Sequence, residues 1–348
     1  MNDNPLFDDN FEESGETLSF SDVLAALQDE ATPVAARYLF RLSALEAADL
    51  ASLAPVWTTL SEERRVAILE DAEELAESNT VVHFDALNAV ALQDEAARVR
   101  TVAARGLWAS EDAKLVPVLV TRLREDKDID VRAQVAATLG HFIYLGEVGE
   151  LAASAHKEAE AALLDILHAD EDPLLRRRAL ESMGYSSRPE IADMIEEAFD
   201  GGEEEWVSSA LFAMGRTADD RWGPQVMQSL ADPNHEISRE AARAAGELEL
   251  SEARPGLFDL LQDEESEVRL AAAWALSQIG GNGIADVLEE LIERAEDDEE
   301  IEFLENAIEN LAFTNEMDEL SLLDFSPEDL EDFANPDSPD DTDEDTEE

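Results

Sequence analysis

The sequence predicts an all-α fold, a right-handed α–α superhelix of about eight or nine antiparallel helix pairs. Two observations carry this prediction. One motif recurs along the chain with a spacing of about 31 residues, and within each copy small or apolar residues recur at every fourth position. A period of 20 to 50 residues marks a repeat architecture. A spacing of four places side chains on one face of a helix.

Each copy of the motif begins with a turn and continues into a helix, and the turn carries an Asp in every copy except the fourth, where Gly201 replaces it. An apolar residue stands five positions after the turn Asp, and the next residue is usually Arg. The apolar positions, separated by 32, 44, 31, 31 and 31 residues, are Val99, Val131, Leu175, Trp206, Ile237 and Val268. Nine positions later, four copies carry Gly140, Gly184, Gly215 and Gly246. We expect the small residues to let the next helix approach closely, and the late Gly to end the helix in the left-handed conformation.

The other parts of the chain follow from this frame. The step of 44 residues between the second and third copies indicates an insertion of about 13 residues. The repeat solenoid is predicted to span 21–313. Within the solenoid we expect degenerate helix pairs at 21–92, clear repeats at 80–294, an insertion near 146–158 and a C-terminal cap at 284–313. Outside it we expect an acidic extension at 1–20 and an acidic, largely disordered tail at 314–348 with an apolar motif at 320–333.

The charge excludes several classes of partner. The chain of 348 residues has 24 Lys and Arg against 85 Asp and Glu, a net charge of −61, and 30 of the acids lie in 1–20 and 295–348, which have no base. This charge disfavours nucleic acid and anionic membranes. The longest uncharged run, 133–146, is shorter than the roughly 20 residues that cross a bilayer, and the acidic N-terminus predicts no secretory signal. We expect a cytoplasmic monomer that binds a protein, with a basic partner as the complement to its charge.

The residue types predict no catalytic, cofactor or metal site. The chain has no Cys, and its five His share no spacing. The recurring Asp and Arg are interpreted as a structural ladder, in which each turn Asp caps its second helix and accepts from an Arg of the same or next repeat. The ladder residues are Asp94, Arg100, Asp126, Arg132, Asp170, Arg176, Asp232, Arg239, Asp263 and Arg269.

Residues 263–276 carry the motif best, with 126–140 and 232–246 close behind. This pattern resembles HEAT repeats, in particular the short HEAT-like repeats of the phycobilin-lyase type. The resemblance implies a scaffold that holds another protein along a curved face. One HEAT-repeat enzyme type, deoxyhypusine hydroxylase, binds two irons through four His-Glu dipeptides. This chain has the single dipeptide His235-Glu236, so we expect that activity to be absent.

The predicted function is therefore a non-enzymatic protein–protein interaction scaffold. Polar positions of the second helices are expected to face the partner, and helical offset selects Gln134, Thr138, Ser208, Glu240 and Arg243. The acidic ends offer a second route, in which Leu322, Leu323, Phe325, Leu330 and Phe333 dock on a grooved partner. The same residues are equally compatible with packing back as a cap. The alternative function is a lyase-like or chaperone-like accessory protein that presents a client for modification, which a convergent titratable pocket would favour.

Overall fold

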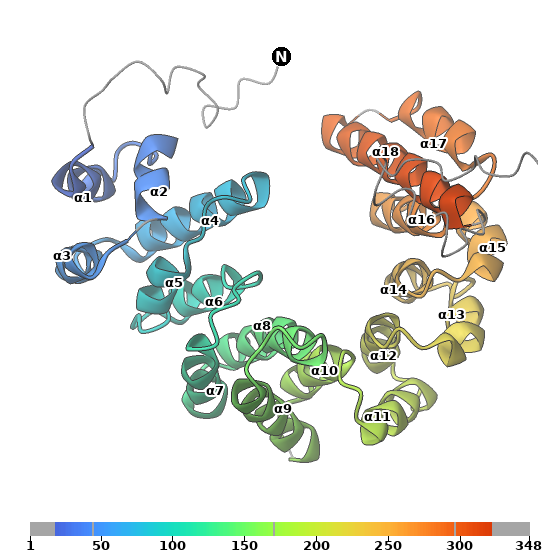
Figure 1. The fold of residues 1–348 in the computed structure, drawn as a ribbon, viewed down its shortest axis with the longest axis horizontal. Coiled ribbons are helices and arrows are strands. Elements are labelled where there is room, and N and C mark those ends of the chain that lie inside the picture. The colour runs from blue at the N-terminus through green and yellow to red at the C-terminus, as the bar shows by residue number, and fades with distance from the viewer. Residues whose placement is uncertain (1–17, 44, 170, 296, 322–348) are drawn as a thin grey trace, which may run out of the picture. The chain divides into compact units, whose positions relative to one another are not determined.

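The computed structural model describes residues 18–43, 45–169, 171–295 and 297–321, with the side chains of the last helix described up to Asn315. Within these residues the fold is all-α, with eighteen α-helices, two short 3-10 helices and no strand (Figure 1). The predicted fold class, an α–α repeat architecture, is confirmed. No helix in the described ranges has the length and apolar character that crossing a membrane requires.

The described helices form nine consecutive pairs, within the predicted eight or nine. The first helices of the pairs are α1 (Phe20–Gln28), α3 (Ala47–Trp57), α5 (Asp85–Ala91), α7 (Leu115–Glu125), α9 (Ala153–His168), α11 (Pro189–Asp200), α13 (Gly223–Ser229), α15 (Arg254–Leu260) and α17 (Ile284–Ile292). The second helices are α2 (Ala36–Leu42), α4 (Glu62–Ser78), α6 (Ala97–Arg105), α8 (Ile129–Glu147), α10 (Pro173–Met183), α12 (Glu204–Arg216), α14 (His235–Glu247), α16 (Ser266–Ile279) and α18 (Asp298–Ser321). The 3-10 helices η1 (Asp220–Trp222) and η2 (Ser251–Ala253) precede α13 and α15.

The chain divides into two compact units, Met1–Trp222 and Gly223–Glu348, here called unit 1 and unit 2. The repeats themselves, which run on at an even spacing of 31 residues through this boundary, did not indicate such a division. Within each unit, successive second helices pack against one another in one row, and the first helices form a second row beside them (Figure 1).

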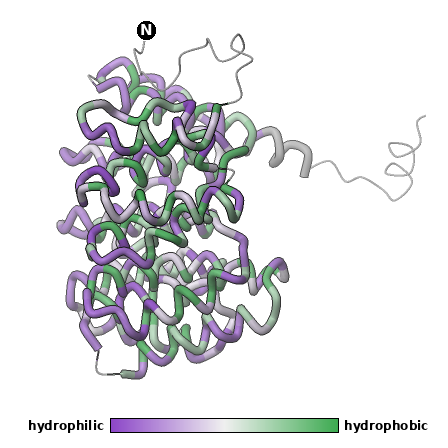
Figure 2. The backbone as a smooth tube through the Cα atoms, turned by 90° about the vertical axis from the view of Figure 1, so that its left-hand side faces the viewer, coloured by the Kyte–Doolittle hydropathy of each residue, from purple (hydrophilic) through white to green (hydrophobic). Residues whose placement is uncertain are grey.

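The core lies between the two rows of helices. Apolar and polar stretches alternate along the helices (Figure 2), as expected when one face of each helix is buried. The first apolar column of the motif is fully or almost fully buried at Val99, Val131, Leu175, Ile237 and Val268. Burying each such side chain contributes about 1.5–3 kcal/mol. Trp206, in the same column, is the exception, because it is only half-buried.

The motif glycines have a different role from the predicted one. None of Gly140, Gly184, Gly215 and Gly246 has a positive φ, so they do not end helices in the left-handed conformation. Gly140, Gly184 and Gly246 instead lie where the next second helix comes close. A methyl group at Gly184 would lie 2.7 Å from the carbonyl oxygen of Ala213, and one at Gly246 would lie 2.8 Å from Cα of Ala275. Glycine therefore sets the spacing between second helices.

The long step in the repeat has a simple structural form. Helix α8 has 19 residues and α9 has 16, longer than most helices of the other pairs, and a short loop that includes Gly149 at φ 84° joins them. The additional residues thus extend both helices. At the other end of the chain, α18 continues as a helix to Ser321, beyond the predicted end of the cap at 313.

Candidate functional site

The arginine that follows the buried apolar column forms an ion pair with the next repeat. Arg100 on α6 donates from Nε and Nη2 to the two carboxylate oxygens of Asp126, at 2.8 and 2.7 Å. Its Nη1 donates to the carbonyl oxygens of Asp94 and Glu95 in its own turn, at 2.9 and 3.0 Å. Burial raises the pKa of Asp126, but hydrogen bonds from Arg100 and from the backbone of Asp128 outweigh it, and the net effect lowers the pKa. This bidentate pair is a closed rung of the ladder.

Three further arginines form closed rungs of the same kind. Arg65 on α4 lies 3.0 Å from Asp94, which also accepts from the Trp57 indole at 2.9 Å. Arg132 on α8 binds both oxygens of Glu171 at 2.8 and 3.1 Å. In unit 2, Arg269 on α16 donates to Glu300 at 3.0 Å. In each rung the carboxylate comes from the repeat that follows the arginine.

The ladder differs in detail from the sequence interpretation. Asp170 lies outside the described residues, and the acid that binds Arg132 is its neighbour Glu171. The turn carboxylates of Asp232 and Asp263 accept the backbone N–H two residues on, at 2.9 Å, and so stabilise the turn instead of capping the helix. Arg239 lies one position beyond the ladder column, and it pairs with Glu240 and Glu267.

Arg176, at the start of α10, occupies the same position as the arginines of the closed rungs but has no carboxylate partner within the described residues, and we call this an open rung. Its Nη2 donates to the carbonyl oxygen of Leu167 at 3.5 Å, the same backbone position that Arg132 uses at Leu123. Within the described ranges, no carboxylate pairs with it, and its buried Nε has no hydrogen-bond partner. The next repeat places Gly201 where the others have the turn Asp. The Trp206 ring instead lies over the guanidinium, at 5.4 Å.

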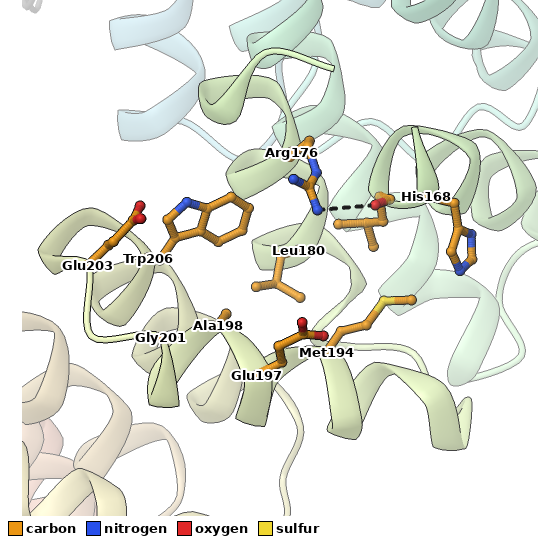
Figure 3. A pocket seen from close by; sticks show the side chains of 10 residues that line it. His168, Arg176, Leu180, Met194, Glu197, Ala198, Gly201, Glu203 and Trp206 are labelled. Carbon is orange, nitrogen blue, oxygen red and sulfur yellow. Dashed lines mark hydrogen bonds between the residues drawn. The ribbon is translucent and has the colours of Figure 1, made fainter. Parts of the chain in front are cut away.

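A pocket of about 480 Å³ opens beside Arg176 (Figure 3). Its volume lies within the usual 300–1,000 Å³ of ligand pockets. It is lined by Leu167, His168, Arg176, Leu180, Met194, Glu197, Ala198, Gly201, Glu203 and Trp206. In Figure 3 the Trp206 indole lies between Glu203 and Arg176, and Leu180 lies between Glu197 and Arg176. The pocket therefore joins one guanidinium to an apolar wall, with two carboxylates at its edges.

Most of the polar residues selected on the second helices are not accessible to a partner. Thr138, Ser208 and Glu240 are buried, with 4, 6 and 8 % of their surface exposed. Thr138 shows why, because its hydroxyl donates to the carbonyl oxygen of Ala104 on the preceding second helix at 2.8 Å. Gln134 and Arg243 are half-buried. The predicted tail residues Leu322, Leu323, Phe325, Leu330 and Phe333 lie outside the described residues.

Four aromatic rings and one arginine, which no sequence pattern had indicated, gather near the C-terminal ends of α8, α10 and α12. We call this group the aromatic strip, and it consists of His141, Tyr144, Tyr185, Phe212 and Arg216. The rings of His141 and Tyr144 are stacked at 6.4 Å, and those of Tyr144 and Tyr185 lie 5.4 Å apart. Arg216 lies over Tyr185 at 4.7 Å and over Phe212 at 4.2 Å. Tyr144 is 44 % exposed, so the strip reaches the surface.

A signal for this strip was present in the sequence. His141, Tyr185 and Arg216 each stand ten positions after the buried apolar column of their repeat, next to the motif Gly. Their chemical types differ, so they form no recognisable pattern until the structure brings them side by side. Burial lowers the pKa of His141, and Glu111 offsets part of that effect. The imidazole is therefore neutral at pH 7 and contributes to the strip as an aromatic ring.

One cluster could hold a metal ion by composition. Ligand atoms of Glu147, His156 and Glu160 all lie within 4.8 Å of one another, beside the loop that joins α10 to α11. Both carboxylates already have partners, since Glu147 accepts the N–H of Ser187 at 3.0 Å and Glu160 accepts the Ser186 hydroxyl at 2.8 Å. Arg188 also lies 3.8 Å from Glu160 and opposes a cation. The cluster is best explained as a tether for this loop.

Comparison with known proteins identifies the repeat. The family model for HEAT repeats matches residues 223–312. The chain is 34 % identical over 77 residues to an epoxyqueuosine reductase of Bacillus cereus, a match that covers 22 % of this chain and 20 % of that protein. The reductase of Bacillus anthracis is 32 % identical over the same length. The chain thus spans about a fifth of the length of the curated relatives it matches.

Solved structures of low sequence identity are also similar. The complex of CpcE and CpcF of phycocyanin lyase from Nostoc sp. matches 88 % of this chain and 100 % of its own, with 17 % identity and a TM-score of 0.48. Human deoxyhypusine hydroxylase in complex with glycerol matches 75 % of this chain and 95 % of its own, with 19 % identity and a TM-score of 0.34. None of these likenesses assigns an activity to this chain.

Proposed function

Because the chain is a HEAT-like repeat protein, we propose that it is a non-enzymatic scaffold that binds a protein partner along the second helices of unit 1. The observation that carries this proposal is the aromatic strip, whose residues lie on or just beyond the C-terminal parts of three successive second helices. Tyrosine, tryptophan and arginine are the residues that dominate binding energy at protein interfaces. Stacked aromatic rings that reach solvent at Tyr144 have the composition of such an anchor.

A basic partner suits the acidic residues on another second helix of unit 1. Helix α4 of unit 1 carries Glu70, Asp71 and Glu74 in one turn. Burial raises the pKa of Asp71, and the charges of Glu74 and Glu70 raise it further. A Lys or Arg of the partner would relieve this repulsion. We therefore propose association that weakens as salt is added, with the protein acting as a monomer in the cytoplasm.

The test is quantitative capture from a lysate of the native host with three matched baits. Tyr144→Gln removes the exposed ring of the strip, and Tyr144→Phe retains the ring. Val148→Gln removes an apolar side chain that is 51 % exposed one turn away, outside the strip. We expect one defined protein to be retained by the wild type and by the Phe and Val148 variants. Its retention by Tyr144→Gln should fall at least about tenfold.

The outcomes separate this surface from the acidic ends. A protein retained equally by all baits, but lost when 322–348 is deleted, would contradict the strip and assign binding to the tail. A partner whose retention does not respond to salt would contradict the basic partner. The alternative of a lyase-like or chaperone-like accessory protein requires that the captured protein be a client whose covalent modification depends on the bait. Mass spectrometry of that protein, with and without the scaffold, distinguishes the two.

A further inference from the structure

Other arginines of the same chain show which partner Arg176 lacks. Arg65, Arg100, Arg132 and Arg269 occupy the corresponding place on their helices, and each binds a carboxylate of the following repeat. Three of these carboxylates lie in the turn before the next second helix, where the repeat after Arg176 has Gly201-Gly202, and the fourth lies in the first turn of α18. Its neighbours Arg177 and Arg178 have acids of their own, Glu205 at 3.1 Å and Glu181 at 2.6 Å. Among the ladder arginines at this helix position, Arg176 is the one that has no carboxylate partner within the described residues.

We propose that the pocket beside Arg176 binds an Asp or Glu side chain of a partner protein, with an adjacent apolar residue of the partner against Leu180, Met194 and Trp206. A buried Nε without a hydrogen-bond partner is costly, and a carboxylate is the bidentate complement of a guanidinium. The pocket of about 480 Å³ has room for a carboxylate and a neighbouring apolar side chain. The inference rests on the proposed scaffold function and names one chemical group that its partner must carry.

The surrounding charge determines what kind of segment can deliver the carboxylate. Glu197 and Glu203, both exposed, lie at the edges of the pocket, and the whole chain carries −61. A phosphate, with up to two charges, or a strongly acidic peptide would be repelled by these groups. A single carboxylate within a basic, partly apolar segment satisfies both Arg176 and the acids around it. The occupant is therefore a basic segment that contains one acid next to an apolar residue.

The geometry favours a carboxylate of a partner over Glu203 of the chain itself as the group that binds Arg176. Glu203, the residue that precedes α12, lines the pocket, and in Figure 3 the Trp206 indole lies between its carboxylate and the guanidinium. Trp206 replaces the smaller residues of the buried column and is itself held by the cation–π contact at 5.4 Å. The same indole therefore screens Glu203 from Arg176 and provides one apolar wall of the pocket.

The first test uses two acetylated and amidated peptides, Lys-Leu-Glu-Lys and Lys-Leu-Gln-Lys, which differ only in the carboxylate. The full chain is titrated with each, and the Nε–H signal of Arg176 is followed by NMR and assigned by its loss in Arg176→Gln. We expect the Glu peptide to shift this signal and to bind at least tenfold more tightly than the Gln peptide. Arg176→Gln should reduce this ratio to about one. Arg124→Gln, which removes the same charge from an exposed pair with Asp165, should leave it unchanged.

The second test introduces the missing carboxylate into the chain itself. Gly201 has φ −60°, so an aspartate fits its backbone, and the nearest atoms to a new Cβ are backbone oxygens of its own turn, at 3.3 Å and beyond. Gly201→Asp should pair with Arg176, raise the Tm by about 2–4 °C relative to Gly201→Asn, and abolish the preference for the Glu peptide. The Asn variant controls for the loss of glycine.

Two results would overturn the proposal. One is equal affinity for the two peptides, or no shift of the Arg176 signal at millimolar peptide. The other is a Gly201→Asp protein that is no more stable than Gly201→Asn and still prefers the Glu peptide. Neither result depends on the capture experiment, because that experiment alters Tyr144 at the other end of the second helices. The peptide test can thus fail while the strip retains its partner, and the reverse also holds.

Discussion

The two ends of the second helices in unit 1 are built differently. At the N-terminal ends, one residue type recurs in register, and the arginines of α4, α6 and α8 each bind a carboxylate of the next repeat. At the C-terminal ends, the same offset holds a histidine, a tyrosine and an arginine in three successive repeats. Residues that stabilise the stack repeat, because each repeat must meet its neighbour in the same way. Residues that meet a partner need not repeat.

Asp126→Ala should have the largest effect, because it breaks a closed rung. It leaves the guanidinium of Arg100, 11 % exposed, without its counter-charge. We expect the free energy of unfolding to fall by about 3–5 kcal/mol, as measured by urea denaturation. Replacing both partners, by Arg100→Met with Asp126→Leu, should cost less than the single change. A double variant as unstable as the single one would contradict this account of the rung.

Gly184→Ala tests the close approach between α10 and α12. A methyl group there would lie 2.7 Å from the Ala213 carbonyl oxygen, so the helices must separate. The expected loss is about 1–3 kcal/mol of the free energy of unfolding. Gly201→Ala is the matched control, since its backbone suits alanine and its contacts are looser, and it should change stability by less than about 0.5 kcal/mol. Equal losses in the two variants would show that glycine matters only for flexibility.

The ion pair between Arg132 and Glu171 makes the free energy of unfolding depend on pH, with a known sign. The hydrogen bond from Arg132 lowers the pKa of Glu171. A carboxyl whose pKa is lower when folded adds stability above its unfolded pKa of about 4.3, and this contribution is lost as the pH falls through the folded pKa. The wild type should therefore exceed Glu171→Gln by about 1 kcal/mol at pH 7 and by nothing near pH 2. Urea denaturation at a series of pH values measures this difference, and a constant difference would contradict the ion pair.

Tyr144→Gln should have the smallest effect on stability, because the side chain of Tyr144 lies at the surface. Its ring is 44 % exposed and contacts other rings of the strip. We expect the free energy of unfolding to change by less than about 0.5–1 kcal/mol, as measured by the same urea titration. A loss as large as that of Gly184→Ala would place the strip among the residues that hold the repeats together, and would remove the contrast between the two helix ends.

Much of the fold could be predicted from the sequence because it depends on recurring positions. The buried column at Val99, Val131 and Leu175 and the arginine that follows it are visible as spacing alone. The role predicted for the motif Gly was wrong. A sequence does not distinguish a glycine that needs a positive φ from a glycine that has no room for a methyl group. Thr138 was wrongly taken as exposed, because its hydroxyl finds a carbonyl on a neighbouring helix that helical offset within one repeat cannot reveal.

The candidate site was predicted less well, for a physical reason. The strip joins unlike residues from three repeats, so no single type recurs to mark it. The open rung is marked by what the following repeat lacks, and Arg176 was assigned to the ladder with the other arginines. The substitution of Gly201 for the turn Asp was visible in the sequence. Only the structure shows that its effect is an unpaired guanidinium beside a pocket.

The open rung at Arg176 also bears on the position at which a long partner would bind. A surface that repeats every 31 residues offers nearly equivalent binding positions. An extended segment that fits one of them can shift by a whole repeat with little loss of binding free energy. Arg176 breaks this translational symmetry, because it is a ladder arginine whose carboxylate the chain itself does not supply. If the proposal holds, this missing acid distinguishes one repeat from similar ones, and a partner would be held at one position instead of many.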